Sequence, residues 1–381
     1  MPKTIKVLLV PLLLVVSLAL SFGTGCTFTT ATSPNSEPGL EIIEEAWQII
    51  FEEYVEKDKL DAAKLSEAAI KGMLEALDDP YTSYLNAQTY QMSKGDLAGK
   101  FEGIGAYVGI RDEQLIIISP IPDSPADRAG IRAGDIILAV EDTPTVGMSL
   151  EEVVLRIRGP EGTPIRLLIL HQGDTEPEEI EIIRAEIKVP SVTFEMKEDI
   201  AYIRIYHFSQ RTNAELRVIL EDIAEQEATG IILDLRSNPG GLLNAVVDVA
   251  NRFLTEGVVL FVLDNQGKQT SWPVEPRTIT TDLPLVALSD NLSASASEVL
   301  IGALQDHGRA TIAGVTTFGK GSVNTLNQLK DGSGLYITTA RWLTPNGRLI
   351  EGKGIEPDFV LELEGEDAIQ WAIDYLKDNK D

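Results

Sequence analysis

The stretch LPLVALSDNLSASASEVLIGALQDH, residues 283–307, decides the fold class of the C-terminal half of the chain. Its first apolar run has the length of a buried strand, and the apolar residues after Ser297 recur at helical spacing. A strand that enters a helix through a tight turn is the unit of a βαβ fold, whose functional side chains lie in loops at the carboxyl ends of the strands. Ser293, Ser295 and Ser297 occupy such a loop, so this turn is the first candidate site.

Strand and helix patterns alternate in the same way over residues 188–381. GIILDLRS (230–237) and VVLFVLD (258–264) have the pattern of strands, and LLNAVVDVANRFL (242–254) that of a helix. EDAIQWAIDYLKD (366–378) predicts a closing amphipathic helix. The sequence therefore predicts a βαβ core domain with a largely parallel sheet.

Residues 95–187 show a different period, with short strands separated by turn residues around one or two helices. In their middle, SPADRAGIRAGDIILAVEDTPT (124–145) resembles a PDZ domain. Such a domain binds an extended peptide as an added strand and takes its terminal carboxylate on backbone N–H groups. The candidates for that loop are Gly103, Ile104, Gly105 and Ala106. The same loop is a poor dinucleotide fingerprint, because its glycine spacing is wrong and no helix follows it.

The N-terminal region resembles an export signal. Residues 1–26 carry two lysines, then an apolar run too short for a comfortable membrane span, and end at Cys26, the only cysteine. This resembles a lipoprotein signal with a lipidated cysteine, although an ordinary cleaved signal and an uncleaved anchor stay open. All three predict export, either anchored to the outer face of a bacterial cytoplasmic membrane or secreted. Residues 27–39 predict a flexible tether, and residues 40–94 a helical module. The expected fold class is thus multidomain α+β.

Composition limits the partners and cofactors. A formal net charge of −27 repels phosphate backbones, so nucleic acid is not expected as a partner. The chain has three histidines and no cluster of cysteine or carboxylate ligands, so neither a metal nor another cofactor is expected. With one cysteine, no internal disulfide can form, and the fold depends on its core.

The serine turn allows two explanations. Ser295 and Glu298 form a capping box, which alone accounts for a serine at a helix start. The same position places a hydroxyl beside unpaired N–H groups and the positive end of the helix dipole, as a nucleophile requires. A histidine base is poorly supported, because His307 lies about 18 Å away along the helix that Ser295 begins.

The remaining base is Lys320, in GVTTFGKGSVN (314–324). This stretch is also nearly a phosphate-binding loop, but Gly321 stands where that motif needs Ser or Thr, and strand-like sequence follows. A solvated loop lysine stays open as the alternative. A base must be neutral, whereas a free lysine titrates near ~10.4, so we expect burial under Phe318 and other apolar groups.

In order, SASASE, GALQDHGRA and TFGKG resemble the carboxyl-terminal processing peptidases, or tail-specific proteases. LDDPYTSYL (77–85), DLRSNPGG (234–241) and GKGIEPD (352–358) match the same family. The resemblance implies a Ser–Lys serine endopeptidase with an inserted PDZ domain. Its implied site consists of a nucleophile, a base, a residue that orients the base, and two oxyanion N–H donors: Ser295, Lys320, Asn324, Ala296 and Gly241.

Two positions in this pattern carry further expectations. Asn324 stands where the family has glutamine, which predicts a looser hold on Lys320 and a slower enzyme. Asp306 matches a family acid of structural role, and we expect it to pair with Arg309.

The sequence thus predicts an exported endopeptidase that selects protein or peptide substrates by free, apolar C-terminal tails. One alternative is a peptide-binding scaffold of the same family that cuts weakly or not at all. Acyl-transfer or acyl-CoA chemistry on a similar core is the other, and the PDZ module argues against it. Whether the chain forms a homo-oligomer, and whether the PDZ domain gates the site, stays open.

Overall fold

A computed structural model describes residues 39–111, 114–121, 123–148, 150–187, 189–363 and 365–379. The expected signal with Cys26, and the tether up to residue 38, lie outside the described residues. The described chain divides into two compact units between Ala69 and Ile70.

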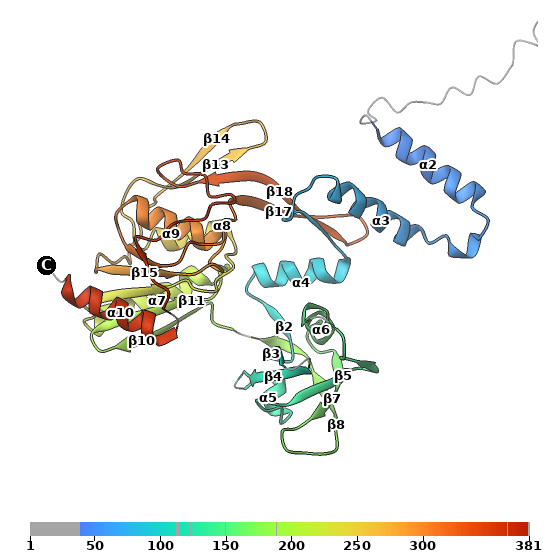
Figure 1. Ribbon diagram of the computed structural model, residues 1–381, viewed down its shortest axis with the longest axis horizontal. Coiled ribbons are helices and arrows are strands. Elements are labelled where there is room, and N and C mark those ends of the chain that lie inside the picture. The colour runs from blue at the N-terminus through green and yellow to red at the C-terminus, as the bar shows by residue number, and fades with distance from the viewer. Residues whose placement is uncertain are drawn as a thin grey trace, which may run out of the picture. The chain divides into compact units, whose positions relative to one another are not determined.

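The first unit is helical, as expected. It contains α2 (Leu40–Glu53), η1 (Lys57–Lys59) and the start of α3 (Ala62–Glu75) (Figure 1). The Asp61 carboxylate begins α3 by accepting hydrogen bonds from the N–H groups of Ala63 and Lys64. None of the described residues in these helices is buried. Every helix in the described ranges is too short or too polar to traverse a bilayer.

The segment after α3 is not purely helical, contrary to the sequence prediction for residues 40–94. The chain turns at Asp79, whose carboxylate accepts hydrogen bonds from Tyr81 N and Thr82 Oγ1, and then forms the strand β1 (Ser83–Leu85). A helix, α4 (Ala87–Leu97), follows from an Asn86 cap. The sequence analysis missed β1 because three residues are too few for a period to show.

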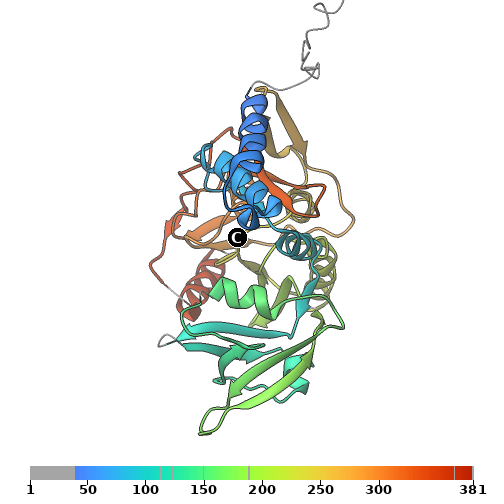
Figure 2. The same cartoon turned by 90° about the vertical axis from the view of Figure 1, so that its right-hand side faces the viewer.

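The middle of the chain forms the expected PDZ-like sheet, with strands coloured cyan to green in Figures 1 and 2. Its strand order is β3-β4-β5-β7-β8, with β6 paired to β5. The strands and accompanying helices are β3 (Ala106–Arg111), β4 (Gln114–Pro120), α5 (Pro125–Arg128), β5 (Ile136–Val140), β6 (Thr143–Pro144), α6 (Leu150–Ile157), β7 (Pro164–Leu170) and β8 (Glu178–Ile183). Ile165, Leu167 and Ile169 alternate along β7 and are fully buried, which gives the sheet one apolar face. Because β3 is an edge strand, it is free to pair with a peptide.

Two short strands join this sheet to the rest of the unit. They are β2 (Phe101–Gly103) and β9 (Ala185–Ile187), which pair antiparallel to each other. The chain therefore enters and leaves the PDZ-like region at neighbouring points.

The C-terminal part contains the predicted largely parallel sheet, in the order β10-β11-β12-β15-β16-β19. Only the β10–β11 pair of this sheet is antiparallel. The strands are β10 (Val192–Lys197), β11 (Ile200–Ile205), β12 (Gly230–Asp234), β15 (Leu285–Ser289), β16 (Thr311–Gly314) and β19 (Phe359–Val360). All residues of β12 and β15 are buried, because helices cover both faces of the sheet.

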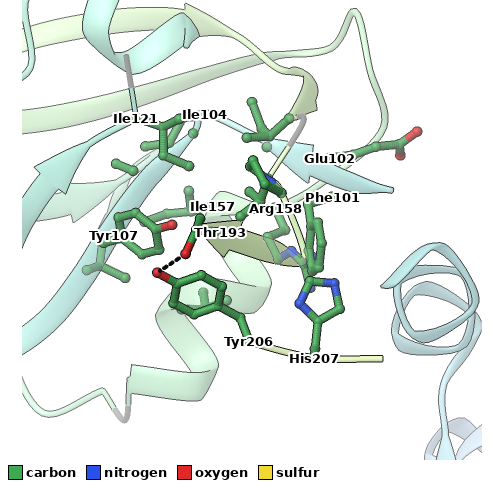
Figure 3. Close-up of a pocket in the computed structure, with 18 residues that line it drawn as sticks. Phe101, Glu102, Ile104, Tyr107, Ile121, Ile157, Arg158, Thr193, Tyr206 and His207 are labelled. Atoms are coloured by element: carbon green, nitrogen blue, oxygen red, sulfur yellow. Dashed lines mark hydrogen bonds between the residues drawn. The ribbon is translucent and has the colours of Figure 1, made fainter. Parts of the chain in front are cut away.

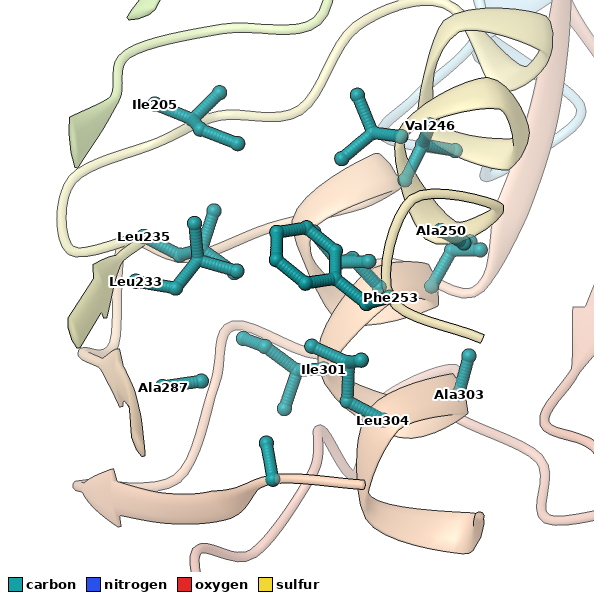
Figure 4. Close-up of a cluster of buried hydrophobic side chains, with 14 of the residues drawn as sticks. Ile205, Leu233, Leu235, Val246, Ala250, Phe253, Ala287, Ile301, Ala303 and Leu304 are labelled. Carbon is teal, nitrogen blue, oxygen red and sulfur yellow. The ribbon is translucent and has the colours of Figure 1, made fainter. Parts of the chain in front are cut away.

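Four helices build these two layers. On one face lie α7 (Thr212–Glu225), α8 (Leu243–Ala250) and α9 (Ala296–Asp306), and on the other lies α10 (Gly365–Asp378). Figure 4 shows Phe253 between the helices and two residues of the sheet side, Leu233 of β12 and Leu235 just after it. This core holds the carboxyl ends of β12 and β15 in fixed register, and the serine turn follows β15.

A second sheet corrects part of the sequence prediction. The strand β13 (Val258–Asp264) does not join the parallel sheet but an antiparallel one, in the order β1-β18-β13-β14, with β17 also paired to β18. Its other strands are β14 (Gln269–Pro273), β17 (Ser322–Gln328) and β18 (Gly334–Leu343). An apolar run suits either sheet, so the pattern of β13 alone could not decide between them.

Candidate active site

The predicted nucleophile lies at the tightest turn of the core. Ser295 is the N-cap of α9, and its backbone has φ 55° and ψ −113°, a strained conformation for a residue with a side chain. Both halves of the predicted capping box are present. Capping and catalysis are compatible, because a hydroxyl that accepts an N–H still has its own proton to donate.

The two flanking serines have structural roles. Ser293 Oγ donates to Leu235 O at 2.8 Å, and Ser297 Oγ donates to Asn238 O at 2.9 Å. Both side chains are fully buried. They fasten the serine turn to the loop after β12, which is the loop that carries Gly241.

That loop brings one unpaired N–H group, of Gly241, to the turn, and the turn itself supplies a second, of Ala296. Gly240 N donates to Asn238 Oδ1, and Leu242 N donates to Phe208 O. Among the described residues, by contrast, no acceptor takes the N–H of Gly241 or of Ala296. A Cβ on Gly241 would lie 2.1 Å from Phe208 O, and its φ is 144°, so the position requires glycine. The two predicted oxyanion donors are therefore free to bind a negative oxygen.

Glu298 joins the backbone of the predicted nucleophile to that of the predicted base. Its Oε2 accepts the backbone N–H of Ser295 at 2.8 Å and that of Lys320 at 2.9 Å. Its Oε1 accepts Gly319 N at 2.7 Å and Thr317 Oγ1 at 2.6 Å. The side chain is fully buried, and burial raises its pKa against these four hydrogen bonds, which lower it. One carboxylate oxygen thus lies between the two predicted catalytic residues.

Lys320 is half-buried beside two aromatic rings. Its Nζ is 5.0 Å from the ring centre of Tyr81 and 5.5 Å from that of Tyr336. Burial lowers the pKa of Lys320, while the negative charges of Glu351, Asp79 and Glu298 oppose that shift. The expected cover by Phe318 is not the main one, because Phe318 is 52% exposed, and the two tyrosines take its place.

Asn324 does not hold Lys320 by a direct hydrogen bond. Its Nδ2 donates to Tyr81 O and to Thr338 Oγ1, both at 3.0 Å, and its Oδ1 accepts from Ser322 Oγ. Asn324 therefore reaches the lysine through the backbone of Tyr81.

A small cavity of about 100 Å³ adjoins the serine. Ser295, Ala296, Gly241 and Asn324 all line it, and most of its remaining wall is apolar: Leu97, Leu242, Leu243, Val299, Val323 and Trp342. None of the three histidines lines it. Among the described residues, no three His, Cys, Asp or Glu side chains are grouped so as to hold a metal ion.

The expected pairing of Asp306 is wrong. Asp306 forms an ion pair with Arg348 and accepts the N–H of Asn346. Arg309 instead donates to the carbonyl oxygens of Phe253, Thr281 and Leu283. Both residues have structural roles, with different partners.

The predicted carboxylate-binding loop lines a second cavity, of about 420 Å³. Gly103, Ile104, Gly105 and Ala106 all border it, together with the edge strand β3 and the helix α6. Among the described residues, the N–H groups of Ile104 and Gly105 donate to no acceptor, whereas their carbonyls accept from Ala126 and Ile121. Figure 3 shows that Tyr206 and His207, which follow β11, also face this cavity. This groove is suited to a peptide that ends in a carboxylate.

A serine at a strained turn beside two free N–H groups, joined to a peptide-binding module, is the arrangement of a serine peptidase. Sequence comparison gives the family. Residues 199–361 match peptidase family S41, residues 116–170 match the PDZ domain, and residues 25–89 match the activating protease CtpB N-terminal domain. The chain belongs to peptidase family S41, as a serine-type carboxy-terminal processing protease.

Similarity to individual relatives extends over most of the chain. The carboxy-terminal-processing protease of Bartonella bacilliformis is 40% identical over 79% of this chain and 70% of its own length. The carboxy-terminal processing protease CtpB of Bacillus subtilis is 36% identical over 88% of this chain and 70% of its own. The solved photosystem II D1 C-terminal processing protease is 29% identical and has a TM-score of 0.55, covering 88% of this chain and 97% of its own.

Two residues of the site, Tyr81 and Tyr336, were not predicted from the sequence. Tyr81 lies in the turn before β1, far from Lys320 in sequence, and Tyr336 lies in β18. The stretch LDDPYTSYL, which matched the family, was the available signal for Tyr81. It gave no reason to connect that tyrosine with a lysine.

Proposed function

We propose that this protein cleaves peptide bonds by a Ser295–Lys320 mechanism and selects substrates by their C-terminal tails. Neutral Lys320 Nζ takes the proton of Ser295 Oγ as that oxygen bonds to the scissile carbonyl carbon. The resulting oxyanion accepts hydrogen bonds from the N–H groups of Gly241 and Ala296. Lys320 then protonates the departing amine as the C–N bond breaks, and water releases the acyl group by the same route.

The observation that carries this proposal is the shared contact of the two residues with Glu298 Oε2. It supports the pair because one carboxylate oxygen holds the backbones of the two residues together. Among the described residues, no hydrogen bond joins Lys320 Nζ to Ser295 Oγ, so the proposed transfer requires the amine to turn toward the hydroxyl. The lowered pKa of Lys320 supports it too, since only a neutral amine can accept that proton.

Substrate selection is the second part of the proposal. The tail of the substrate adds to the edge of β3, and its carboxylate binds the free N–H groups of Ile104 and Gly105. The apolar lining of the groove, including Val154 and Ile157, supports an apolar last side chain. The small apolar cavity beside Ser295 supports a small apolar residue before the cleaved bond.

We further propose that the protein is exported, with the N-terminal segment as a signal or lipid anchor. The support is in the sequence alone: two lysines, an apolar run and Cys26.

The experiment that tests the mechanism compares wild type with Ser295→Ala and Lys320→Ala on an unstructured protein with an apolar C-terminus. Each variant should lose essentially all cleavage while it remains folded by circular dichroism, because the two residues act as a unit. Ser293→Ala and Ser297→Ala are the matched controls. If Ser295→Ala retains activity and one of the control variants loses it, Ser295 is not the nucleophile.

Asn324 tests the alternative of a binding scaffold. Asn324→Gln should leave cleavage equal or faster, and Asn324→Ala should slow it on the order of 10-fold. If wild type is inert in single-turnover assays and Asn324→Gln cuts, the natural protein is a scaffold.

A further inference from the structure

Tyr81 lies at the end of a chain of contacts that leads to Lys320. Its backbone is held from both sides, because its N–H donates to Asp79 Oδ1 and its carbonyl accepts from Asn324 Nδ2. Beyond it, Thr82 Oγ1 accepts the N–H of Thr338, a residue of β18. These bonds fix a loop tip that would otherwise be mobile.

The pairing of β1 with β18 sets both tyrosine rings. Ser83 of β1 lies directly opposite Tyr336 of β18. The pairing thus brings Tyr81, two positions before Ser83, beside Lys320, which Tyr336 also covers. The Lys320 Nζ lies 5.0 Å from the centre of the Tyr81 ring and 5.5 Å from that of Tyr336, and it donates no hydrogen bond to any of the described residues.

Two opposing effects act on an ammonium in this place. Each ring face attracts a cation. The partial loss of water around the amine acts in the opposite direction and is the larger effect, so the neutral amine is favoured. The carboxylates of Asp79, Glu298 and Glu351 favour the charged form, and Arg341, 4.0 Å from Glu351, weakens one of them. Burial raises the pKa of both Tyr81 and Tyr336, so both rings stay uncharged.

We propose that Tyr81 is a positioning residue of the active site, whose ring, together with that of Tyr336, excludes water from Lys320 and keeps it in its neutral form. This inference rests on the proposed function, in which neutral Lys320 is the catalytic base. It gives β1 a role in catalysis without contact between β1 and the substrate. Asn324 then acts on the lysine through Tyr81, by holding the loop that carries the ring.

The test uses the full chain with Tyr81→Ala and Tyr81→Phe. Tyr84→Ala, in the strand β1 that follows Tyr81, is the control for general damage to this part of the chain. The first readout is kcat/KM against pH on one peptide. The second is the pH dependence of Lys320 acetylation by limiting acetic anhydride, followed by mass spectrometry, which needs no enzyme activity.

Tyr81→Ala should move both pH profiles upward, toward an ordinary lysine. Each unit of that shift lowers activity tenfold on the acid side of the profile. We expect at least a tenfold loss at pH 7, recovery toward wild type at high pH, and little change in KM. Tyr81→Phe should match wild type, because the aromatic ring, and not its hydroxyl, excludes water from Lys320. If Tyr81→Ala does not fold, Tyr336→Ala should shift the acetylation profile in the same direction.

An equal loss of activity at every pH, with an unchanged acetylation midpoint, would overturn the proposal and leave Tyr81 a structural residue. Failure of the proposed function looks different. In that case Lys320→Ala still cleaves, while the acetylation midpoint still moves in Tyr81→Ala.

Discussion

The buried carboxylate of Glu298 gives the sharpest prediction about stability and activity together. Its two oxygens accept four hydrogen bonds, from Ser295, Thr317, Gly319 and Lys320, and it is fully buried. Glu298→Ala leaves four donors without an acceptor. A buried unsatisfied donor costs about 1–3 kcal/mol, so four would cost about 4–12 kcal/mol if all stayed dry.

That range is comparable to the whole stability of a typical domain, about 5–15 kcal/mol. The turn therefore has to open and let water reach some of the donors. We expect a measured loss of about 3–5 kcal/mol, because only some of the four donors then stay dry, at about 1–3 kcal/mol each. Activity should fall to background, because Ser295 and Lys320 lose their common contact.

Glu298→Gln should be milder. A glutamine keeps one acceptor oxygen, which can face Ser295 N and Lys320 N, and its amide can donate to Thr317 Oγ1. Gly319 N and the Thr317 hydroxyl proton are then left without their acceptor, at about 1–3 kcal/mol each if they stay dry. We expect a folded enzyme with reduced but measurable turnover.

The assay is urea unfolding of both variants followed by single-turnover cleavage. Glu225→Ala, an exposed glutamate on α7, is the control and should change stability by less than about 0.5 kcal/mol. If Glu298→Ala unfolds like this control and still cleaves, the carboxylate does not connect the two residues as argued.

Three more predictions follow from the lysine and the groove. Because burial lowers the pKa of Lys320, the cleavage rate should rise with pH and level off below the pH range in which an ordinary lysine titrates. EDTA should not reduce the rate, and a loss of activity in EDTA that zinc restores would contradict a Ser–Lys mechanism. Lys320→Met should raise the free energy of unfolding, most at low pH, since folding penalises the charged amine of the wild type. This gain should shrink as the pH rises from the lowered pKa of the folded state toward ~10.4, the pKa of the unfolded state. A gain that grows with pH would contradict the argument. Amidating a substrate's C-terminus should slow its cleavage, measured as kcat/KM, and equal rates for amidated and free tails would argue against recognition by Ile104 and Gly105.

The sequence predicted what neighbouring residues determine. A strand, a small-residue turn and a helix at residues 285–306 follow from local period and capping, and the structure has all three. Ser295 could be singled out there because only one of the three serines occupies the N-cap.

The environment of Lys320 could not be predicted in the same way. One covering ring comes from the turn before β1 and the other from β18, and these segments meet only in the folded state, so no spacing in the sequence relates both rings to the lysine. Asp306 and Arg309 illustrate the opposite error. They are close in sequence, but the chain turns at Gly308, which has φ 61°, and each side chain meets a different partner.

The pairing of β1 with β18 also bears on the stage of synthesis and folding at which the enzyme becomes active. The two strands are separated by about 250 positions, so their contact closes one of the longest loops in the chain and should form late in folding. During synthesis, Tyr81 emerges early and has to wait for residues 334–336 before it can cover the lysine. A half-made or partly unfolded chain would therefore keep a hydrated, charged Lys320 and be inert. On this account the long-range strand pair delays proteolysis until the molecule is complete.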